Sequence, residues 1–311
     1  MRGNRYRLRH VHCVAEAEFH LNYRHAFHAG NFADVVKHVL LTRVLLYLQD
    51  KPAAFRVIDT HAGAGRYDLT GDEATRSGEW RDGIGKLLSA EIPPDAAALL
   101  KPYLDIVRAF NATDELHSYP GSPLIARALL RPQDRLVACE LEPNARRALV
   151  DCLRRDKQAR VVELDGWTAL TAYVPPNERR GVVLIDPPFE AKDEFVRLAD
   201  KFAAAFAKWP TGIYVLWYPV KDIKAAHALS AAVARTVSAR ASKAARDEVR
   251  CLRVELTVDR TAGADRGGLD TAGLLVVNPP WTLATELRTL LPVLARALGR
   301  TSAARFSVDP L

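Results

Sequence analysis

The 311-residue sequence predicts an α/β fold with one mainly parallel, doubly wound sheet. Short apolar runs that end in a polar residue alternate with stretches of helical spacing, and a glycine-rich turn at 59–65 follows the first run. Strands separated by helices imply right-handed crossovers and parallel pairing. Because open α/β sheets bind nucleotides at the carboxyl end of the first strand, we expect a ligand site at this turn.

Five short apolar runs read as the parallel strands, and they cover 55–58, 136–139, 161–164, 182–185 and 213–217. Helical spacing predicts helices at 31–49, where Asn31 is a suitable cap, and at 143–155. The late runs 251–258 and 273–277 are separated by a glycine-rich stretch without a long helix. This arrangement predicts a closing hairpin rather than another crossover.

The segment 68–118 interrupts the alternation of strands and helices with apolar residues at helical spacing. We expect a small helical insertion there, packed over the sheet, in a position suited to substrate contacts. Ser122 and Pro123 then form a good helix start. The predicted division is an N-terminal arm at 1–21, a main domain at 22–67 and 119–300, and a C-terminal tail at 301–311.

Composition narrows the class of protein. The formal net charge of +7 and the sequence pI of about 9.3 are compatible with a polyanionic partner but do not require one. No apolar stretch approaches the ~20 residues of a membrane span, and the first twenty residues lack the apolar region of a secretory signal. The cysteines form no C-x-x-C pair, which predicts reduced thiols in a cytoplasmic protein; they are Cys13, Cys139, Cys152 and Cys251.

Polar side chains stand at the ends of successive strands: Asp59 with His61, then Glu140, Asp165 and Asp186. In a doubly wound sheet these ends lie along one edge, where ligands bind. Glu140 suits two ribose hydroxyls, because a carboxylate accepts two hydrogen bonds, and Asp165 suits the adenine amine of a cofactor. Glycines such as Gly63 allow the backbone to approach a ligand closely.

The glycine turn excludes two common cofactor sites. Gly63-Ala64-Gly65 lacks the third glycine and the later acidic residue of a dinucleotide fingerprint, and no G-K-[ST] follows it as in a P-loop. A nucleoside cofactor without a pyrophosphate remains, and S-adenosylmethionine is the obvious candidate. No metal is expected, because the histidines lack the carboxylate and cysteine partners of a zinc site; they are His25, His28, His38 and His61.

The tetrapeptide Asp186-Pro187-Pro188-Phe189 follows the apolar run 182–185. The Asp186 carboxylate and the Pro187 carbonyl can accept the two hydrogens of an exocyclic amine, which orients its nitrogen for attack on a methyl group. The Phe189 ring can stack on a base that has left its own stack. The alternative is that the prolines form only a rigid end to the strand.

A second sequence, Asn278-Pro279-Pro280-Trp281, has nearly the same form and follows the run 274–277. Both cannot be the catalytic loop. Asp186 belongs to the fourth strand of the parallel series, next to the first strand, whereas Asn278 belongs to the closing hairpin, remote from the switch point. The order of the strands therefore predicts that Asp186 is catalytic.

Several motifs together resemble the bacterial RlmJ family of 23S ribosomal RNA (adenine-N6) methyltransferases. They are the residues at 23–31, 34–38, 59–67, 119–123, 186–189, 212–219 and 278–281. Two departures stand out. The arm at 1–20 precedes the usual start of the family, and Phe189 replaces a tyrosine common in this loop, which keeps the stacking surface but loses a hydroxyl.

The resemblance implies a class I, Rossmann-like methyltransferase fold with a seven-stranded sheet, S-adenosylmethionine as cofactor and protein-free 23S rRNA as substrate. A cytoplasmic monomer is expected, with Asp186 central to catalysis. The implied cofactor contacts are His38, His61, Gly63, Ser122, Glu140, Asp165, Gly166 and Asp186. The implied substrate contacts are Tyr23, His25 and Lys37.

Two other classes of function stay open from the sequence. A DNA adenine-N6 or a protein glutamine methyltransferase would use the same Pro-Pro-aromatic loop. A non-catalytic RNA-binding protein is the third hypothesis, but such a protein gains nothing from four acids facing a polyanion.

Overall fold

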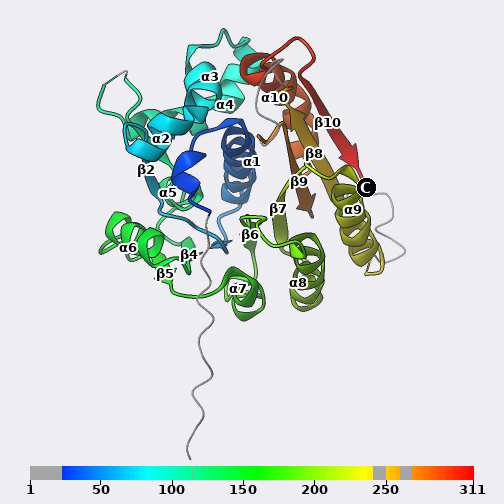
Figure 1. Cartoon of the computed structure of the whole chain (residues 1–311). Coiled ribbons are helices and arrows are strands. Elements are labelled where there is room, and N and C mark those ends of the chain that lie inside the picture. Colours follow the sequence, from blue (N-terminus) through cyan, green and yellow to red (C-terminus); the bar gives the residue numbers. More distant parts are fainter. Residues whose placement is uncertain (1–22, 114, 241–249, 260–267) are drawn as a thin grey trace, which may run out of the picture.

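The computed structural model describes residues 23–113, 115–240, 250–259 and 268–311 of the chain. Its centre is an eight-stranded sheet in the order β10-β8-β9-β7-β6-β1-β4-β5 (Figure 1). The five parallel strands are β1 (Arg56–Asp59), β4 (Arg135–Cys139), β5 (Ala159–Val162), β6 (Gly181–Ile185) and β7 (Ile213–Pro219). The antiparallel strands are β8 (Cys251–Thr257), β9 (Thr271–Val277) and β10 (Arg305–Pro310).

Strand β1 marks the switch point of the sheet. From β1 the chain builds β4 and β5 on one side, then returns to place β6 and β7 on the other. The predicted mainly parallel, doubly wound fold is therefore confirmed, and so is the predicted hairpin, since β8 pairs antiparallel with β9. Because β6 pairs with β1, the strand that precedes Asp186 lies beside the strand that precedes the glycine turn.

The main sheet has eight strands, one more than the seven expected. Residues 305–310 form β10, which pairs antiparallel with β8. Arg253 Nη2 on β8 donates to Asp309 Oδ2 on β10 at 2.8 Å. The prediction of a tail at 301–311 was wrong because β10 is largely exposed or half-buried and so carries no apolar alternation. Pairing covers an edge of β8 that would otherwise present unpaired backbone groups.

Side-chain alternation on the strands creates two apolar cores. On β6, Val182 and Leu184 face one core, and Val183 and Ile185 face the other. The first core is closed by α1 (Phe32–Gln49), α4 (Pro94–Ala109), α5 (Ser122–Ala128) and α10 (Leu283–Leu298). The second is closed by α7 (Gly166–Ala172), α8 (Glu194–Lys208) and α9 (Ile223–Ser238). None of the helices in the described ranges is both long and apolar enough to cross a membrane.

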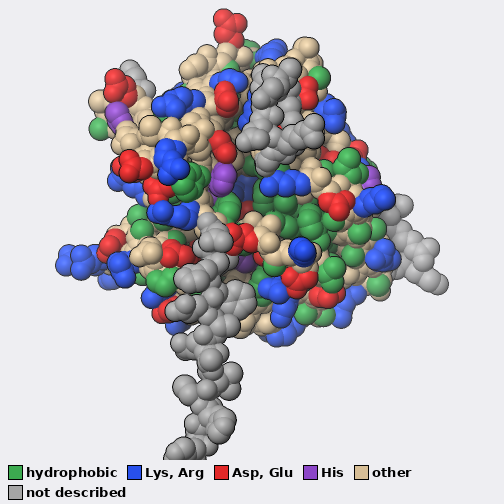
Figure 2. All heavy atoms as spheres, viewed as in Figure 1, with side chains coloured by type: hydrophobic (Ala, Val, Ile, Leu, Met, Phe, Trp, Pro, Cys, Tyr) green, Lys and Arg blue, Asp and Glu red, His purple; other side chains and the backbone are tan. Residues whose placement is uncertain are grey.

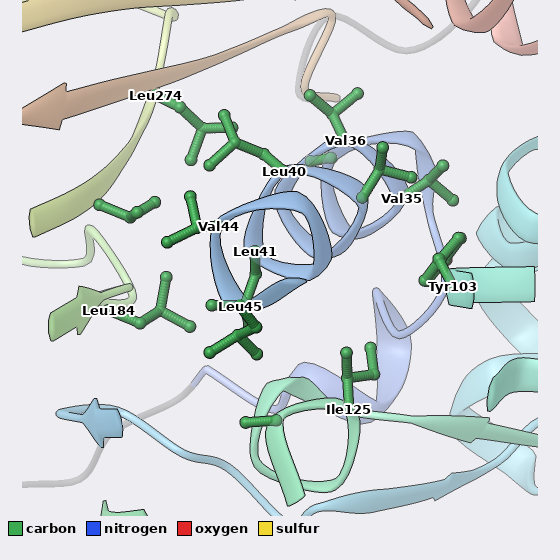
Figure 3. Packing of buried hydrophobic residues seen from close by; sticks show 14 of the residues in the cluster. Val35, Val36, Leu40, Leu41, Val44, Leu45, Tyr103, Ile125, Leu184 and Leu274 are labelled. Carbon is green, nitrogen blue, oxygen red and sulfur yellow. The ribbon is translucent and has the colours of Figure 1, made fainter. Parts of the chain in front are cut away.

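Helix α1 is buried on nearly every side. Asn31 caps it as predicted, accepting a hydrogen bond from the Asp34 amide at 3.0 Å. Figure 3 shows its leucines and valines packed among side chains from α4, α5, β6 and β9. Fourteen of its eighteen residues are buried, and these include charged or polar side chains near its start. Those groups need partners in the protein, because they have lost water.

The predicted insertion begins and ends on a small two-stranded sheet. Strands β2 (Arg66–Asp68) and β3 (Ser118–Pro120) pair antiparallel, so that Asp68 lies opposite Ser118. Between them lie α2 (Asp72–Ser77), the π-helical turn η2 (Arg81–Gly85), α3 (Lys86–Ser89) and α4. Two further elements complete the fold: the 3-10 turn η1 (His25–Phe27) before α1, and α6 (Pro143–Cys152) between β4 and β5.

Truncation of Leu40 to alanine should lower the free energy of unfolding by about 2–5 kcal/mol, because the fully buried side chain leaves a cavity between α1 and the sheet. Urea denaturation measures the change. Val196→Ala on α8, where the side chain is 65% exposed, is the control and should change the free energy by less than about 0.5 kcal/mol. Equal losses in both variants would contradict this account of the core.

Candidate active site

A cleft of about 1400 Å³ opens along the carboxyl ends of β1, β4 and β6 and beside the start of α1. It is lined by every predicted cofactor and substrate residue: Tyr23, His25, Lys37, His38, His61, Gly63, Ser122, Glu140, Asp165, Gly166 and Asp186. In Figure 2, acidic, basic and histidine side chains gather near the centre of the face shown. Pro187 and Phe189, the other two predicted site residues, are not in its lining.

The glycine turn after β1 is fixed from two sides. Gly63 has a φ of +62°, and a Cβ there would lie 2.2 Å from the Tyr67 hydroxyl, so only glycine fits. The Gly63 amide donates to Glu140 Oε2 at 2.7 Å, and the Ala64 amide donates to the Tyr67 hydroxyl at 3.1 Å. The turn is thus held against the carboxylate at the end of the neighbouring strand.

Glu140 and Asp165 retain capacity for a ligand. Glu140 accepts one backbone N–H on each oxygen, from Gly63 and Glu142, and burial raises the pKa of its carboxyl despite these bonds. Since each oxygen has two lone pairs, Glu140 can accept further hydroxyl donors. Asp165 caps α7 through Oδ2, which accepts from the amide and hydroxyl of Thr168 at 2.9 and 3.0 Å.

Two histidines on the cleft are neutral at pH 7. Burial lowers the pKa of His38 to about 3 and that of His61 to about 4. His38 Nδ1 lies 2.7 Å from the Tyr119 hydroxyl, and His61 Nδ1 lies 2.8 Å from the Thr60 hydroxyl. A Cβ at Gly166 would lie 2.4 Å from His61 Nε2, so this glycine lets α7 approach the ring. Both imidazoles can therefore offer hydrogen bonds but no charge.

Ser122 connects the cleft with the acid at the end of β1. Its hydroxyl donates to Asp59 Oδ2 at 2.7 Å. Asp59 is buried and is not in the lining of the cleft, and burial raises the pKa of its carboxyl to about 7 although the Ser122 bond opposes this. Asp59 thus holds the Ser122 hydroxyl without itself lining the cleft.

A chain of polar contacts links the N-terminal residues to Asp186. Tyr23 Oη lies 2.7 Å from His25 Nδ1, and His25 Nε2 lies 3.0 Å from Asp34 Oδ2. Asp34 Oδ1 accepts from Lys37 Nζ at 2.8 Å, and Lys37 Nζ also donates to Asp186 Oδ2. The three predicted substrate residues and the predicted catalytic acid therefore form one connected group.

The pKa values of Lys37 and Asp34 are shifted by the opposite charges beside them. Burial disfavours the charged form of Lys37, yet Asp186 and Asp34 together raise its pKa above the ordinary value. Burial likewise opposes ionisation of Asp34, but His25 and Lys37 hold its pKa well below the usual range. Lys37 is consequently a cation that bridges the carboxylates of Asp34 and Asp186.

Asp34 is the residue that the sequence analysis missed. It is 2% exposed and also accepts from the Gly30 amide at 2.9 Å, so it holds the turn before α1 as well as His25 and Lys37. The available signal was an acid three residues before a lysine, at the third position after the helix cap. That spacing is common on exposed helices, and it gives no sign that the pair is buried.

The loop after Asp186 is arranged differently from the expectation. Pro187 is buried, and Phe189 has a φ of +53°. The Phe189 ring lies with its centroid 4.8 Å from that of Phe195 and 5.7 Å from that of Trp217. The structure therefore brings Asp186 together with the other site residues but packs the Phe189 ring against apolar neighbours outside the cleft lining.

The second Pro-Pro-aromatic loop lies at the amino ends of the parallel strands, remote from the switch point as predicted. Strand β9 runs antiparallel to β7, and Val277 pairs with Tyr214 at the start of β7. Asn278 Nδ2 donates to the carbonyls of Pro210 and Gly212 at 2.9 and 2.7 Å.

Across the parts of the chain that the structure describes, no group of three histidine, cysteine or acidic side chains could hold a metal ion.

Comparison with known proteins agrees with this arrangement. A family model described as "Ribosomal RNA large subunit methyltransferase D, RlmJ" matches residues 52–309. The chain belongs to the RlmJ family. The predicted family is thereby confirmed, and the methyl donor of this methyltransferase is S-adenosylmethionine, as the strand-end acids and glycine turn indicated.

Two curated relatives and one solved structure cover most of the chain. The protein "Ribosomal RNA large subunit methyltransferase J" of Escherichia coli is 41% identical over 88% of this chain and 92% of its own length. The protein of the same name from Haemophilus influenzae is 37% identical over 93% and 98%. A crystal structure from Legionella pneumophila superposes with a TM-score of 0.80 at 31% identity, covering 91% of this chain and 98% of that one.

Asp34→Asn should reduce kcat by at least about tenfold, since Lys37 and His25 would lose the charge that positions them. The affinity for S-adenosylmethionine, measured by calorimetry, should change little, because Asp34 does not line the cleft. Asn31→Ala removes the neighbouring helix cap and a hydrogen bond to Glu79 but leaves Asp34 in place, and it is the matched control, with a loss of about 1 kcal/mol in stability. An unchanged kcat in Asp34→Asn would refute this role.

The buried histidines predict loss of stability in mild acid. Between the unfolded pKa of about 6.5 and the folded value, the unfolded chain binds a proton that buried His38 excludes, so stability falls as pH decreases. His38→Gln should reduce the slope of unfolding free energy between pH 6.5 and 5 by up to about 1.4 kcal/mol per pH unit. His227→Gln, at an exposed histidine, should leave the slope unchanged; equal slopes in all three proteins would contradict the prediction.

Proposed function

We propose that the chain transfers a methyl group from S-adenosylmethionine to the exocyclic N6 of an adenine in 23S rRNA. The observation that carries the proposal is the position of Asp186, a carboxylate at the end of β6, in the same cleft as Glu140, Asp165 and the glycine turn. Membership of the RlmJ family supports ribosomal RNA as the substrate. Arg24, Arg66, Arg197 and Lys201 also line the cleft and are suited to phosphate contacts.

In this proposal the protein orients the amine rather than deprotonating it first. Asp186 accepts one N–H, and the Pro187 carbonyl accepts the other, which directs the nitrogen lone pair away from both. When bound, S-adenosylmethionine supplies an electrophilic methyl group. Methylation makes the amine nitrogen cationic and acidic, so that its proton can leave to Asp186 or to water.

Lys37 explains why Asp186 serves as an acceptor. The ammonium group donates to Oδ2 and so fixes the orientation of the carboxylate. Each carboxylate oxygen has two lone pairs, so Asp186 can still accept a hydrogen bond from an amine. Asp34 and His25 hold the lysine from the other side.

Stacking by Phe189 requires a rearrangement of its loop. The ring has to leave Phe195 and Trp217 to cover a base in the cleft. A positive φ at a residue other than glycine is a strained conformation that costs about 1–3 kcal/mol, so its release contributes to the movement. We propose that the flipped adenine draws the ring into the cleft, and that a monomer acts in this way on rRNA free of ribosomal proteins in the cytoplasm.

Asp186→Ala should lower the rate of methyl transfer by about 10²–10³-fold, the usual loss for one preorganised polar group. The assay measures N6-methyladenosine by mass spectrometry after incubation of the protein with protein-free 23S rRNA. Asp193→Asn is the matched control, because this exposed acid lies in the same loop and contacts Arg197 without itself lining the cleft. It should retain full activity.

The substrate class is decided by parallel reactions with duplex DNA and a glutamine-containing peptide. Methylation of either in preference to rRNA would replace the proposal with one of the other methyltransferase reactions. Binding of rRNA without any methyl transfer by the wild-type protein would indicate a non-catalytic RNA-binding protein.

A further inference from the structure

The second Pro-Pro-aromatic loop presents an unusually exposed ring. Trp281 is 82% exposed, more than any other large hydrophobic side chain in the described ranges. The loop that carries it is fixed at its base, since Asn278 donates to two carbonyls before β7. The loop lies at the amino ends of the parallel strands, whereas the catalytic cleft lies at their carboxyl ends.

Cations surround a small cavity beside this loop. The cavity, of about 220 Å³, is lined by Asn278 and Pro279 together with Lys51, Arg179 and Arg180. None of these three cations forms an ion pair with another residue in the described ranges. We call Lys51, Arg179, Arg180 and the loop 278–281 the rear surface.

Nearby charges leave the rear surface basic. Burial lowers the pKa of Arg180, and the neighbouring Arg131 lowers it further, so the two guanidinium groups repel one another. Asp134 is occupied by Arg131, with Nε to Oδ2 at 2.8 Å, and Asp50 is the other nearby carboxylate. The cations on the cavity thus outnumber the acids available to neutralise them.

We propose that the rear surface binds a single-stranded segment of the RNA substrate, with Trp281 stacked on an unpaired base and the cations contacting phosphates. This inference rests on the proposed function, which supplies RNA as the polymer. Trp281 offers an exposed ring, and the first two residues of its loop line a cavity together with three cations. Aromatic rings and cations together bind single strands, because every base has a stacking face and every nucleotide a phosphate.

The separation of the two sites determines which RNA can reach both. The five-residue strand β6 spans about 17 Å; Gly181 at its start lines the cavity of the rear surface, and Asp186 after its end lines the cleft. A short oligonucleotide that fills the cleft does not reach Trp281. An rRNA fragment of domain size can contact both, so the rear surface should increase affinity for long RNA alone.

The test compares the affinity of the full-length protein for an rRNA domain fragment and for a short hairpin that carries the methylated adenine. Trp281→Ala should weaken binding of the long fragment by about 5- to 150-fold, the range for one stacked base, and leave binding of the hairpin and kcat at saturating RNA unchanged. Trp281→Phe should restore most of the affinity. Ile223→Ala, at a side chain 63% exposed on α9, is the matched control and should change neither affinity.

The charge contribution is tested separately. Lys51→Gln/Arg179→Gln should reduce the slope of log affinity against log salt by about 1.4 for the long fragment, as expected for two lost phosphate contacts. Unchanged long-fragment affinity in Trp281→Ala, or an equal loss for both RNAs, would overturn the rear surface. Binding is measured without methyl transfer, so a Trp281-dependent affinity in a protein that fails to methylate rRNA would sustain this inference while refuting the proposed function.

Discussion

The structure depends on the burial of charge in the first turns of α1. This helix is enclosed by other helices and by the sheet, yet it carries Asp34, Lys37 and His38 at positions with almost no solvent. Charges removed from water are tolerated only when each has a partner, and the partner of Lys37 is Asp186 at the end of β6. The proposed catalytic acid is therefore held by the core of the protein rather than by a surface loop. Loss of Lys37 would leave Asp34 and Asp186 without the cation that they share, which links catalysis to folding.

Strand direction assigns different positions to two nearly identical loops. Both Asp186 and Asn278 follow a short apolar strand and precede two prolines and an aromatic residue. Strand β6 is parallel to β1 and delivers Asp186 to the edge with the glycine turn, whereas β9 is antiparallel to β7 and delivers Asn278 to the opposite edge. The local sequence predicts a Pro-Pro-aromatic loop after each strand, and the topology of the sheet decides what surrounds that loop.

Much of this arrangement follows from sequence because it depends on local or strongly periodic signals. The parallel strands, the Asn31 cap and the hairpin all have such signals. Strand β10 does not, because it is an edge strand without an apolar face. The contacts of Asp34 and the packing of Phe189 against Trp217 depend on residues distant in the chain, and no spacing rule encodes them. The sequence thus identified most of the residues around the cleft. The contacts between their side chains are visible only in the three-dimensional structure.

The proposed mechanism also accounts for the kind of base that the cleft can accept. The Asp186 carboxylate and the Pro187 carbonyl are both acceptors, so they favour an exocyclic amine and oppose a carbonyl oxygen such as O6 of guanine. A misplaced carbonyl would leave two desolvated acceptors facing a third, a more severe penalty than the loss of one attraction. Two acceptors alone do not separate adenine from cytosine, since both present an amine. The size of the ring that Phe189 has to cover is the feature able to do so, which makes the movement of that residue a part of base selection.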